Sequence, residues 1–71
     1  MKVVAEVAGK VWKIEVQAGA RLGIDDAIMI LESMKMEIPV TAPVAGTLRL
    51  LHVKEGDAVK EGDVVAELET G

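Results

Sequence analysis

The sequence predicts an all-β domain, either a β-sandwich or a flattened barrel, and three observations support this fold class. Val and Ile together supply sixteen of the 71 residues, and β-branched side chains favour strands. Short apolar segments alternate with turns rich in Gly and Asp, which is typical of sandwiches and barrels. The chain also repeats itself, because many residues match the residue 37 positions later.

The internal repeat has no gap and spans most of the chain. Ten identities occur over the 32 pairs from Val3/Val40 to Met34/Gly71, and they include the tripeptide Val-Ala-Gly at residues 7–9 and 44–46. Two copies are too few for a solenoid. We therefore expect a single domain over residues 1–71, in which two similar halves, 3–34 and 40–71, are related by a pseudo-twofold axis.

Each half is expected to contain three strands separated by turns, and no segment predicts a helix. The expected strands are residues 3–7, 11–16 and 27–31 in the first half and 38–42, 48–53 and 64–68 in the second. Apolar and charged residues alternate over 11–16, which places Trp12, Ile14 and Val16 on one face and predicts a partly buried Trp12. Gly9 and Gly46 fall in matching turns, where glycine relieves backbone strain.

The composition narrows the possible functions. The chain has no Cys and one histidine, His52, which excludes disulfide frameworks, Cys nucleophiles and Cys/His zinc sites. A net charge of −4 without a basic stripe argues against a nucleic-acid partner. No apolar run approaches the roughly 18 residues of a membrane span, so we expect a cytoplasmic protein without membrane contact. His52 is expected on a strand surface, and Asp57 and Asp63 suit turns better than a metal site.

One polar hexapeptide, residues 32–37, separates two apolar strands and is predicted to form a hairpin tip. Gly, Pro, Asn and Asp are absent from it, and Met34 and Met36 flank Lys35, which is unusual for a turn. In a purely structural interpretation, the methionines fill gaps in the core and Lys35 is a solvated charge. Alternation instead places both methionines on one face and Lys35 on the other. A structural role explains a single methionine better than such a symmetric pair, so the tip is the candidate functional site.

At this tip the sequence resembles a known family. The segment Glu32-Ser33-Met34-Lys35-Met36 is similar to the attachment motif of biotinyl/lipoyl domains, and the segments 41–46 and 56–63 resemble the second half of such domains. The resemblance covers essentially the whole chain and is closest for the small free-standing members. It implies a flattened barrel of two four-stranded antiparallel sheets with the lysine at a tight hairpin. The gapless repeat leaves no room for the protruding thumb that some members insert.

The resemblance also implies a function. A biotin protein ligase would attach biotin covalently to the amine of Lys35, and the biotin would carry a carboxyl group between biotin carboxylase and carboxyltransferase components. The chain would be a carrier, a monomer in isolation, with no catalytic residue of its own. Ligase recognition would fall to the neighbours of the lysine, which are Glu32, Ser33, Met34, Met36 and Glu37. Glu32 and Glu37 are equally well explained as ordinary solvated turn residues.

Two alternatives stay open. Lipoyl domains carry lipoate on the corresponding lysine, so the chain could be a lipoyl carrier or accept both groups. It could also be an interaction module whose lysine is never modified.

One departure from the family concerns local geometry: Asp25 stands where the second half has Gly62. If the backbone there needs a positive φ, Asp tolerates it less well than Gly.

Overall fold

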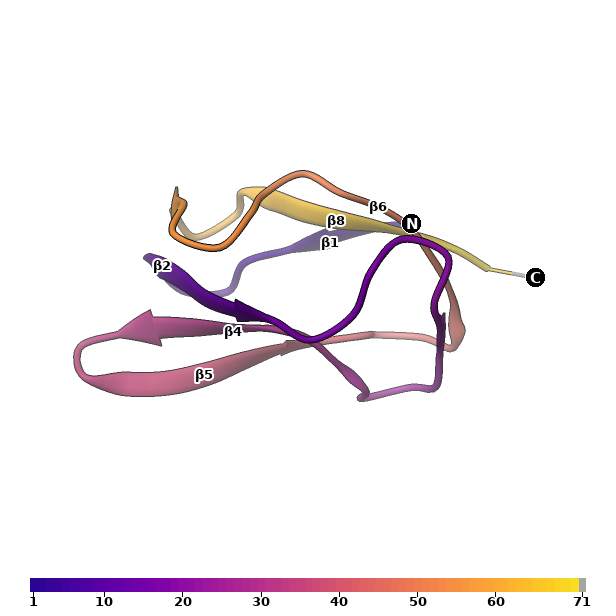
Figure 1. Ribbon diagram of the computed structural model, residues 1–71, viewed down its shortest axis with the longest axis horizontal. Coiled ribbons are helices and arrows are strands. Elements are labelled where there is room, and N and C mark those ends of the chain that lie inside the picture. Colours follow the sequence, from indigo (N-terminus) through magenta and orange to yellow (C-terminus); the bar gives the residue numbers. More distant parts are fainter. Residues whose placement is uncertain (71) are drawn as a thin grey trace.

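The computed structural model describes residues 1–70, which form eight β-strands and no helix. The strands are β1 (Lys2–Val4), β2 (Gly9–Ile14), β3 (Arg21–Leu22), β4 (Ala27–Ser33), β5 (Met36–Thr41), β6 (Gly46–Leu51), β7 (Ala58–Val59) and β8 (Val64–Glu69). They make two four-stranded antiparallel sheets, ordered β1-β8-β6-β3 and β5-β4-β2-β7. The sheets stack as two layers of a molecule measuring 35 × 18 × 17 Å, with the β4–β5 hairpin at one end (Figure 1). The predicted all-β sandwich is confirmed.

A shift of 37 residues converts each sheet into the other. It maps β1, β2, β3 and β4 onto β5, β6, β7 and β8, and so maps one strand order onto the other. Backbone hydrogen bonds follow the same rule: the amide of Ala5 donates to the carbonyl of Asp63, and that of Ala42 to the carbonyl of Asp26, both at 2.9 Å. Each sheet thus contains strands from both halves, and the halves obey the pseudo-twofold relation.

The core lies between the two sheets and, within residues 1–70, contains only hydrophobic side chains. Burying a Val, Leu or Ile side chain contributes about 1.5–3 kcal/mol, so these layers stabilise a small domain without aromatic packing. The core residues are Val3, Ala5, Val11, Leu22, Ile28, Met29, Leu31, Val40, Ala42, Leu48, Val59, Val65, Ala66 and Leu68.

The predicted inward face of β2 is wrong at Trp12, because the strand contains a β-bulge. The register with β4 shifts between Val11 and Lys13, so the parity of inward and outward residues changes there. Val11 is consequently buried, whereas Trp12 is 51% exposed. Ile14 and Val16 still pack against the core, as the alternation predicted.

Gly9 and Gly46 do not lie in turns, contrary to expectation, but begin β2 and β6. A Cβ atom at Gly9 would lie 2.6 Å from the carbonyl oxygen of Glu32, and one at Gly46 would lie 2.7 Å from that of Glu69. Glycine is needed at both positions because two backbones approach closely. Gly9 thereby brings β2 directly against the base of the β4–β5 hairpin.

The turns before β4 and β8 share one geometry despite the departure at Asp25. Asp25 has φ 70° and its equivalent Gly62 has φ 91°. The carboxylate of Asp26 accepts a hydrogen bond from the Gly23 amide at 2.8 Å, and Asp63 accepts one from the Lys60 amide at the same distance. These turns follow the two-residue strands β3 and β7, which the sequence pattern missed. The segments from β2 to β3 and from β6 to β7 match in length, so no thumb interrupts residues 1–70.

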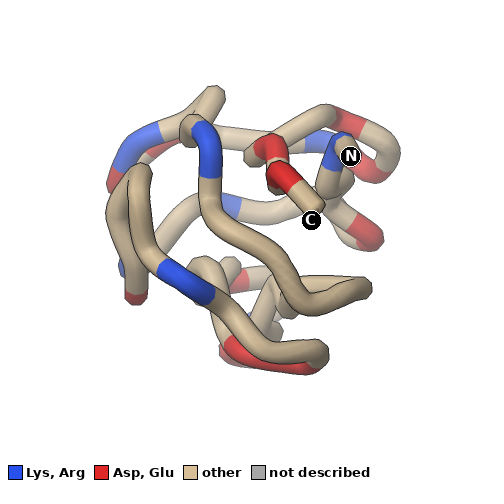
Figure 2. Tube along the Cα trace, turned by 90° about the vertical axis from the view of Figure 1, so that its right-hand side faces the viewer, with Lys and Arg blue, Asp and Glu red and all other residues tan. Residues whose placement is uncertain are grey.

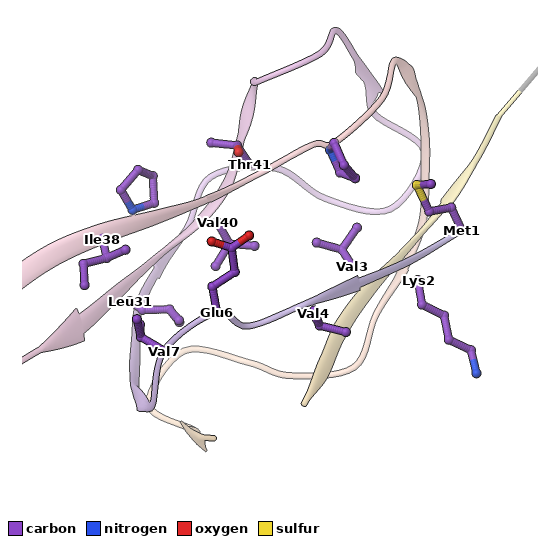
Figure 3. A pocket seen from close by; sticks show the side chains of 12 residues that line it. Met1, Lys2, Val3, Val4, Glu6, Val7, Leu31, Ile38, Val40 and Thr41 are labelled. Atoms are coloured by element: carbon purple, nitrogen blue, oxygen red, sulfur yellow. The ribbon is translucent and has the colours of Figure 1, made fainter. Parts of the chain in front are cut away.

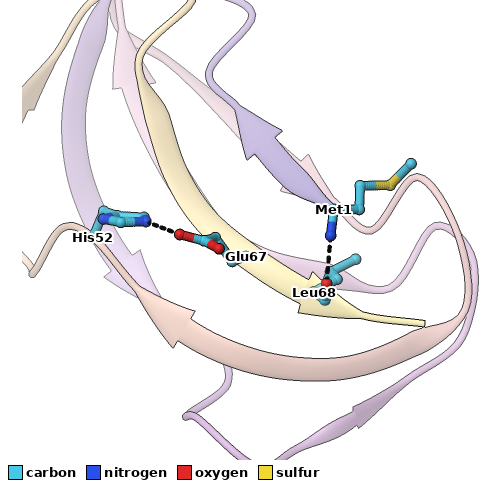
Figure 4. Close-up of polar contacts among 4 residues, drawn as sticks. All are labelled: Met1, His52, Glu67 and Leu68. Carbon is cyan, nitrogen blue, oxygen red and sulfur yellow. Dashed lines mark hydrogen bonds and ion pairs between the residues drawn. The ribbon is translucent and has the colours of Figure 1, made fainter. Parts of the chain in front are cut away.

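The end of the molecule opposite the hairpin holds Met1 and the end of β8. The Met1 amine donates a hydrogen bond to the Leu68 carbonyl at 2.7 Å (Figure 4). Figure 2 views this end and shows acidic and basic residues interspersed around it. Residues 1–70 include no helix that is long and apolar enough to cross a membrane.

Candidate functional site at the β4–β5 hairpin

The two strands of the β4–β5 hairpin are paired right up to the turn that connects them. Glu32 faces Glu37 and Ser33 faces Met36 across the two strands, so the turn consists of Met34 and Lys35 alone. The turn is therefore shorter than the hexapeptide, residues 32–37, that the sequence predicted. Because the alternation of strand residues stops at Ser33, the prediction that Met34 and Met36 share a strand face does not hold.

Both turn residues adopt the left-handed backbone conformation. Met34 has φ 52° and Lys35 has φ 65°. Positive φ at both central residues is characteristic of a type I′ turn, which matches the twist of a two-residue hairpin. Asn-Gly is the usual occupant of such a turn, and a left-handed residue with a Cβ costs about 1–2 kcal/mol. The chain thus holds a strained conformation with two residues that are poorly suited to it. Strain of this kind clusters at functional sites.

The tip exposes apolar surface around the lysine. Met34 is 92% exposed and Met36 is 59% exposed, so neither methionine fills a gap in the core. No hydrogen bond or ion pair within residues 1–70 involves the Lys35 side chain. The amine at the tip is consequently accessible, and flexible thioethers beside it offer an adaptable contact surface.

Carboxylates gather on the outer face of the hairpin, two residues below the turn on each strand. Glu32 and Glu37 are directly opposite one another, and Lys10 of β2 faces Glu32 on its other side. Like charges placed opposite each other across strands are destabilising. The pair therefore gives this face a local negative charge that Lys10 offsets only in part.

Ser33 anchors the base of the tip. Its hydroxyl donates a hydrogen bond to the carbonyl of Ala8 at 2.8 Å, which ties the last residue of β4 to the segment before β2. Together with the close approach at Gly9, this contact makes the hairpin a rigid support. Of the sequence-predicted site residues, Lys35, Met34 and Met36 are exposed at the tip, Glu32 and Glu37 lie below it, and Ser33 holds it in place.

Two other features are less suited to a functional site. An apolar groove of about 350 Å³ separates the edge strands β1 and β5, and its lining includes one carboxylate, Glu6, and no histidine (Figure 3). His52 Nε2 lies 2.7 Å from Glu67 Oε2 on the protein surface (Figure 4). This hydrogen bond is the largest of the influences on the pKa of Glu67, and it lowers that pKa.

The contact between His52 and Glu67 could not be predicted from the sequence. His52 is exposed, as predicted, but it lies just beyond β6 rather than within a strand. Its partner Glu67 is fifteen residues away on the neighbouring strand. Only the pairing of β6 with β8 brings the two side chains together.

The fold and the tip together define a class of protein: a small β-sandwich that presents one lysine on a rigid hairpin. The sequence model of the biotin/lipoyl family, described as "Biotin-requiring enzyme", matches residues 1–68. The chain therefore belongs to the biotin/lipoyl attachment family, as its motifs predicted.

Relatives and solved structures agree with this assignment. The "Biotin/lipoyl attachment protein" of Bacillus subtilis is 47% identical over 96% of this chain and 93% of its own length. The "Biotinylated protein TB7.3 homolog" of Mycobacterium leprae is 44% identical over 87% of each chain. The urea carboxylase of Kluyveromyces lactis contains a similar structure, with a TM-score of 0.93 and 32% identity over 97% of this chain. The match spans only 6% of that large enzyme.

Proposed function

We propose that this chain is a biotin carboxyl carrier whose biotin is attached to Lys35. The observation that carries the proposal is the exposed, left-handed Met34-Lys35 turn, which presents a lysine in a member of the biotin/lipoyl family. The biotinylated relative and the urea carboxylase, by their names, favour biotin and a carboxylase system.

The tip fits covalent attachment. Lys35 Nζ would lose a proton and form an amide bond with the carboxyl carbon of activated biotin, whose leaving group departs. A lysine amine is normally protonated at neutral pH, so the ligase supplies the base or the environment that releases the proton. When bound, biotin supplies the atom that accepts and gives up a carboxyl group. The chain contributes reach, because Lys35 extends from a rigid hairpin that Ser33 and Gly9 hold against β2.

The partners follow from this role. A biotin protein ligase modifies the chain, and biotin carboxylase and carboxyltransferase components load and unload the carboxyl group. The chain itself acts as a carrier rather than an enzyme, in the cytoplasm and as a monomer in isolation. Met34 and Met36 are the residues best exposed for ligase contact.

Co-expression with a biotin protein ligase tests the proposal. We expect a streptavidin signal, and a peptide map that locates the added mass on Lys35. Lys35→Arg should abolish the signal while Lys60→Arg, which alters an exposed lysine at another turn, should leave it unchanged. Equal signals from wild type and Lys35→Arg would refute attachment at Lys35.

A lipoyl carrier is the second candidate, because the name of the Bacillus subtilis relative includes both groups. The same tip would present the same lysine, so geometry does not separate the two cofactors. Parallel co-expression with a biotin ligase and a lipoate ligase, followed by intact-mass measurement, separates them. Lipoate without biotin on Lys35 would replace the first proposal with the second, and no modification by either ligase would favour an interaction module.

A further inference from the structure

The two halves place different residues at one equivalent surface position. Trp12 in β2 and Arg49 in β6 are related by the 37-residue shift, and each lies at a register shift between its strand and the neighbouring one. Both side chains are exposed, with 51% of Trp12 accessible. Since the second half folds with an arginine there, the fold does not require a tryptophan. An exposed indole without a folding role suggests an interaction surface.

Trp12 lies on the outer face of the sheet that carries the hairpin. A shallow hollow of about 260 Å³ is lined by Trp12, Lys10 and Glu32, together with Val11 and Gly56. Glu32 in turn faces Glu37 across the hairpin. The surface is therefore continuous from the indole through the two carboxylates to the tip.

The distance from Trp12 to the tip suits a single interface. Val11 pairs with Leu31, three residues before the turn, so the indole lies about 10–14 Å from the tip along the strand. A standard interface buries about 800 Å² on each partner, equal to a disc of about 16 Å radius. A protein that takes Lys35 into its active site and rests on this face would therefore cover Trp12 as well.

We propose that the biotin protein ligase docks on the outer face of β2, β4 and β5 and uses Trp12 as its anchor. This inference rests on the proposed biotinylation of Lys35. Tryptophan is among the residues that most often dominate interface energies. The ligase surface should offer an apolar pocket for the indole and cationic groups opposite Glu32 and Glu37. A second copy of this chain is a poorer occupant, because it would bring the same pair of carboxylates against this face.

Kinetics with varied carrier concentration test the docking face. Trp12→Arg introduces the residue that the second half carries at the equivalent bulge, so the fold should tolerate it. We expect the KM for the carrier to rise about tenfold or more, with kcat nearly unchanged, and Trp12→Phe to recover most of the loss. Two controls should keep the wild-type KM: Arg49→Ala on the opposite sheet, and Ile24→Glu, which replaces another exposed apolar residue by its second-half equivalent.

A direct binding measurement uses the fact that Trp12 is the only tryptophan. A Lys35→Arg carrier containing 5-fluorotryptophan, which cannot be modified, is titrated with unlabelled ligase and followed by ¹⁹F NMR. We expect its resonance to shift in a saturable way. A resonance that shifts with carrier concentration alone would identify a second copy as the occupant and overturn the inference.

The outcomes separate this inference from the proposed function. If wild type is biotinylated on Lys35 while Trp12→Arg shows an unchanged KM and the ¹⁹F resonance does not respond to ligase, only the docking face is refuted. If wild type is not biotinylated, or if Lys35→Arg is still biotinylated, the proposed function itself fails.

Discussion

The two halves of this protein share their interior and differ on their surface. Equivalent positions hold Leu31 and Leu68 in the core, and equivalent loop amides and carbonyls make the same hydrogen bonds. On the surface, Trp12 corresponds to Arg49 and Ile24 to Glu61. Residues that both halves keep are therefore explained by the fold, whereas residues that only one half has are candidates for function. Trp12 belongs to the second group, whereas Lys35 lies in the turn that joins the two halves.

The largest expected effect concerns the shared interior. Leu31→Ala and Leu68→Ala each remove an almost fully buried side chain, which should cost about 3 kcal/mol of unfolding free energy in either half. A domain of this size has roughly 4–10 kcal/mol in total, so both variants should unfold at much lower urea concentration. Urea unfolding followed by circular dichroism measures both. Costs that differ by more than about 1 kcal/mol would show that the halves are not energetically equivalent.

The next effect concerns the turn that joins the two halves. Replacing Met34-Lys35 by Asn-Gly supplies residues that tolerate the left-handed conformation, and should stabilise the protein by about 1–2 kcal/mol. The thermal midpoint should rise while attachment is lost with the lysine. An unchanged or lower midpoint would mean that the native turn carries no strain. Ala45→Gly, in the segment between β5 and β6, is a control for glycine in a loop without positive φ.

The comparison also explains how far the sequence could predict this structure. The repeat and the alternation predicted the sandwich, and the placement of Lys35 between two strands predicted the tip. Trp12 was assigned to the wrong environment because a bulge changes strand parity without any sequence mark. The strands β3 and β7 were missed because two residues show no alternation, and their pairing depends on distant partners. The positive φ of Met34 could not be inferred, because neither it nor Lys35 is a residue that favours such a turn.

A smaller effect concerns the turn position at which the halves hold Asp25 and Gly62. Both adopt a left-handed backbone, and a Cβ at Gly62 would meet no atom within 4 Å. Gly62→Asp should therefore cost only the backbone strain, about 1 kcal/mol. Asp25→Gly should relieve a similar strain. Part of the gain in stability should be lost, because glycine gives the unfolded chain more conformational entropy. Urea unfolding of both variants tests this, and a cost above 2 kcal/mol for Gly62→Asp would contradict a purely conformational difference.

The smallest effect concerns an ion pair that only the second half has. The hydrogen bond from His52 lowers the pKa of Glu67 below its usual 4.5; burial opposes this shift, and the charges of His52, Arg49 and Lys2 support it. Because the folded-state pKa is depressed, the stabilisation is present above the unfolded value and is lost as pH falls through the folded value. The thermal midpoint of wild type should therefore drop more steeply than that of Glu67→Gln between about pH 5 and pH 3. Glu69→Gln, which alters an exposed carboxylate of the same strand, should follow wild type, and identical slopes for wild type and Glu67→Gln would mean that the pair adds no stability.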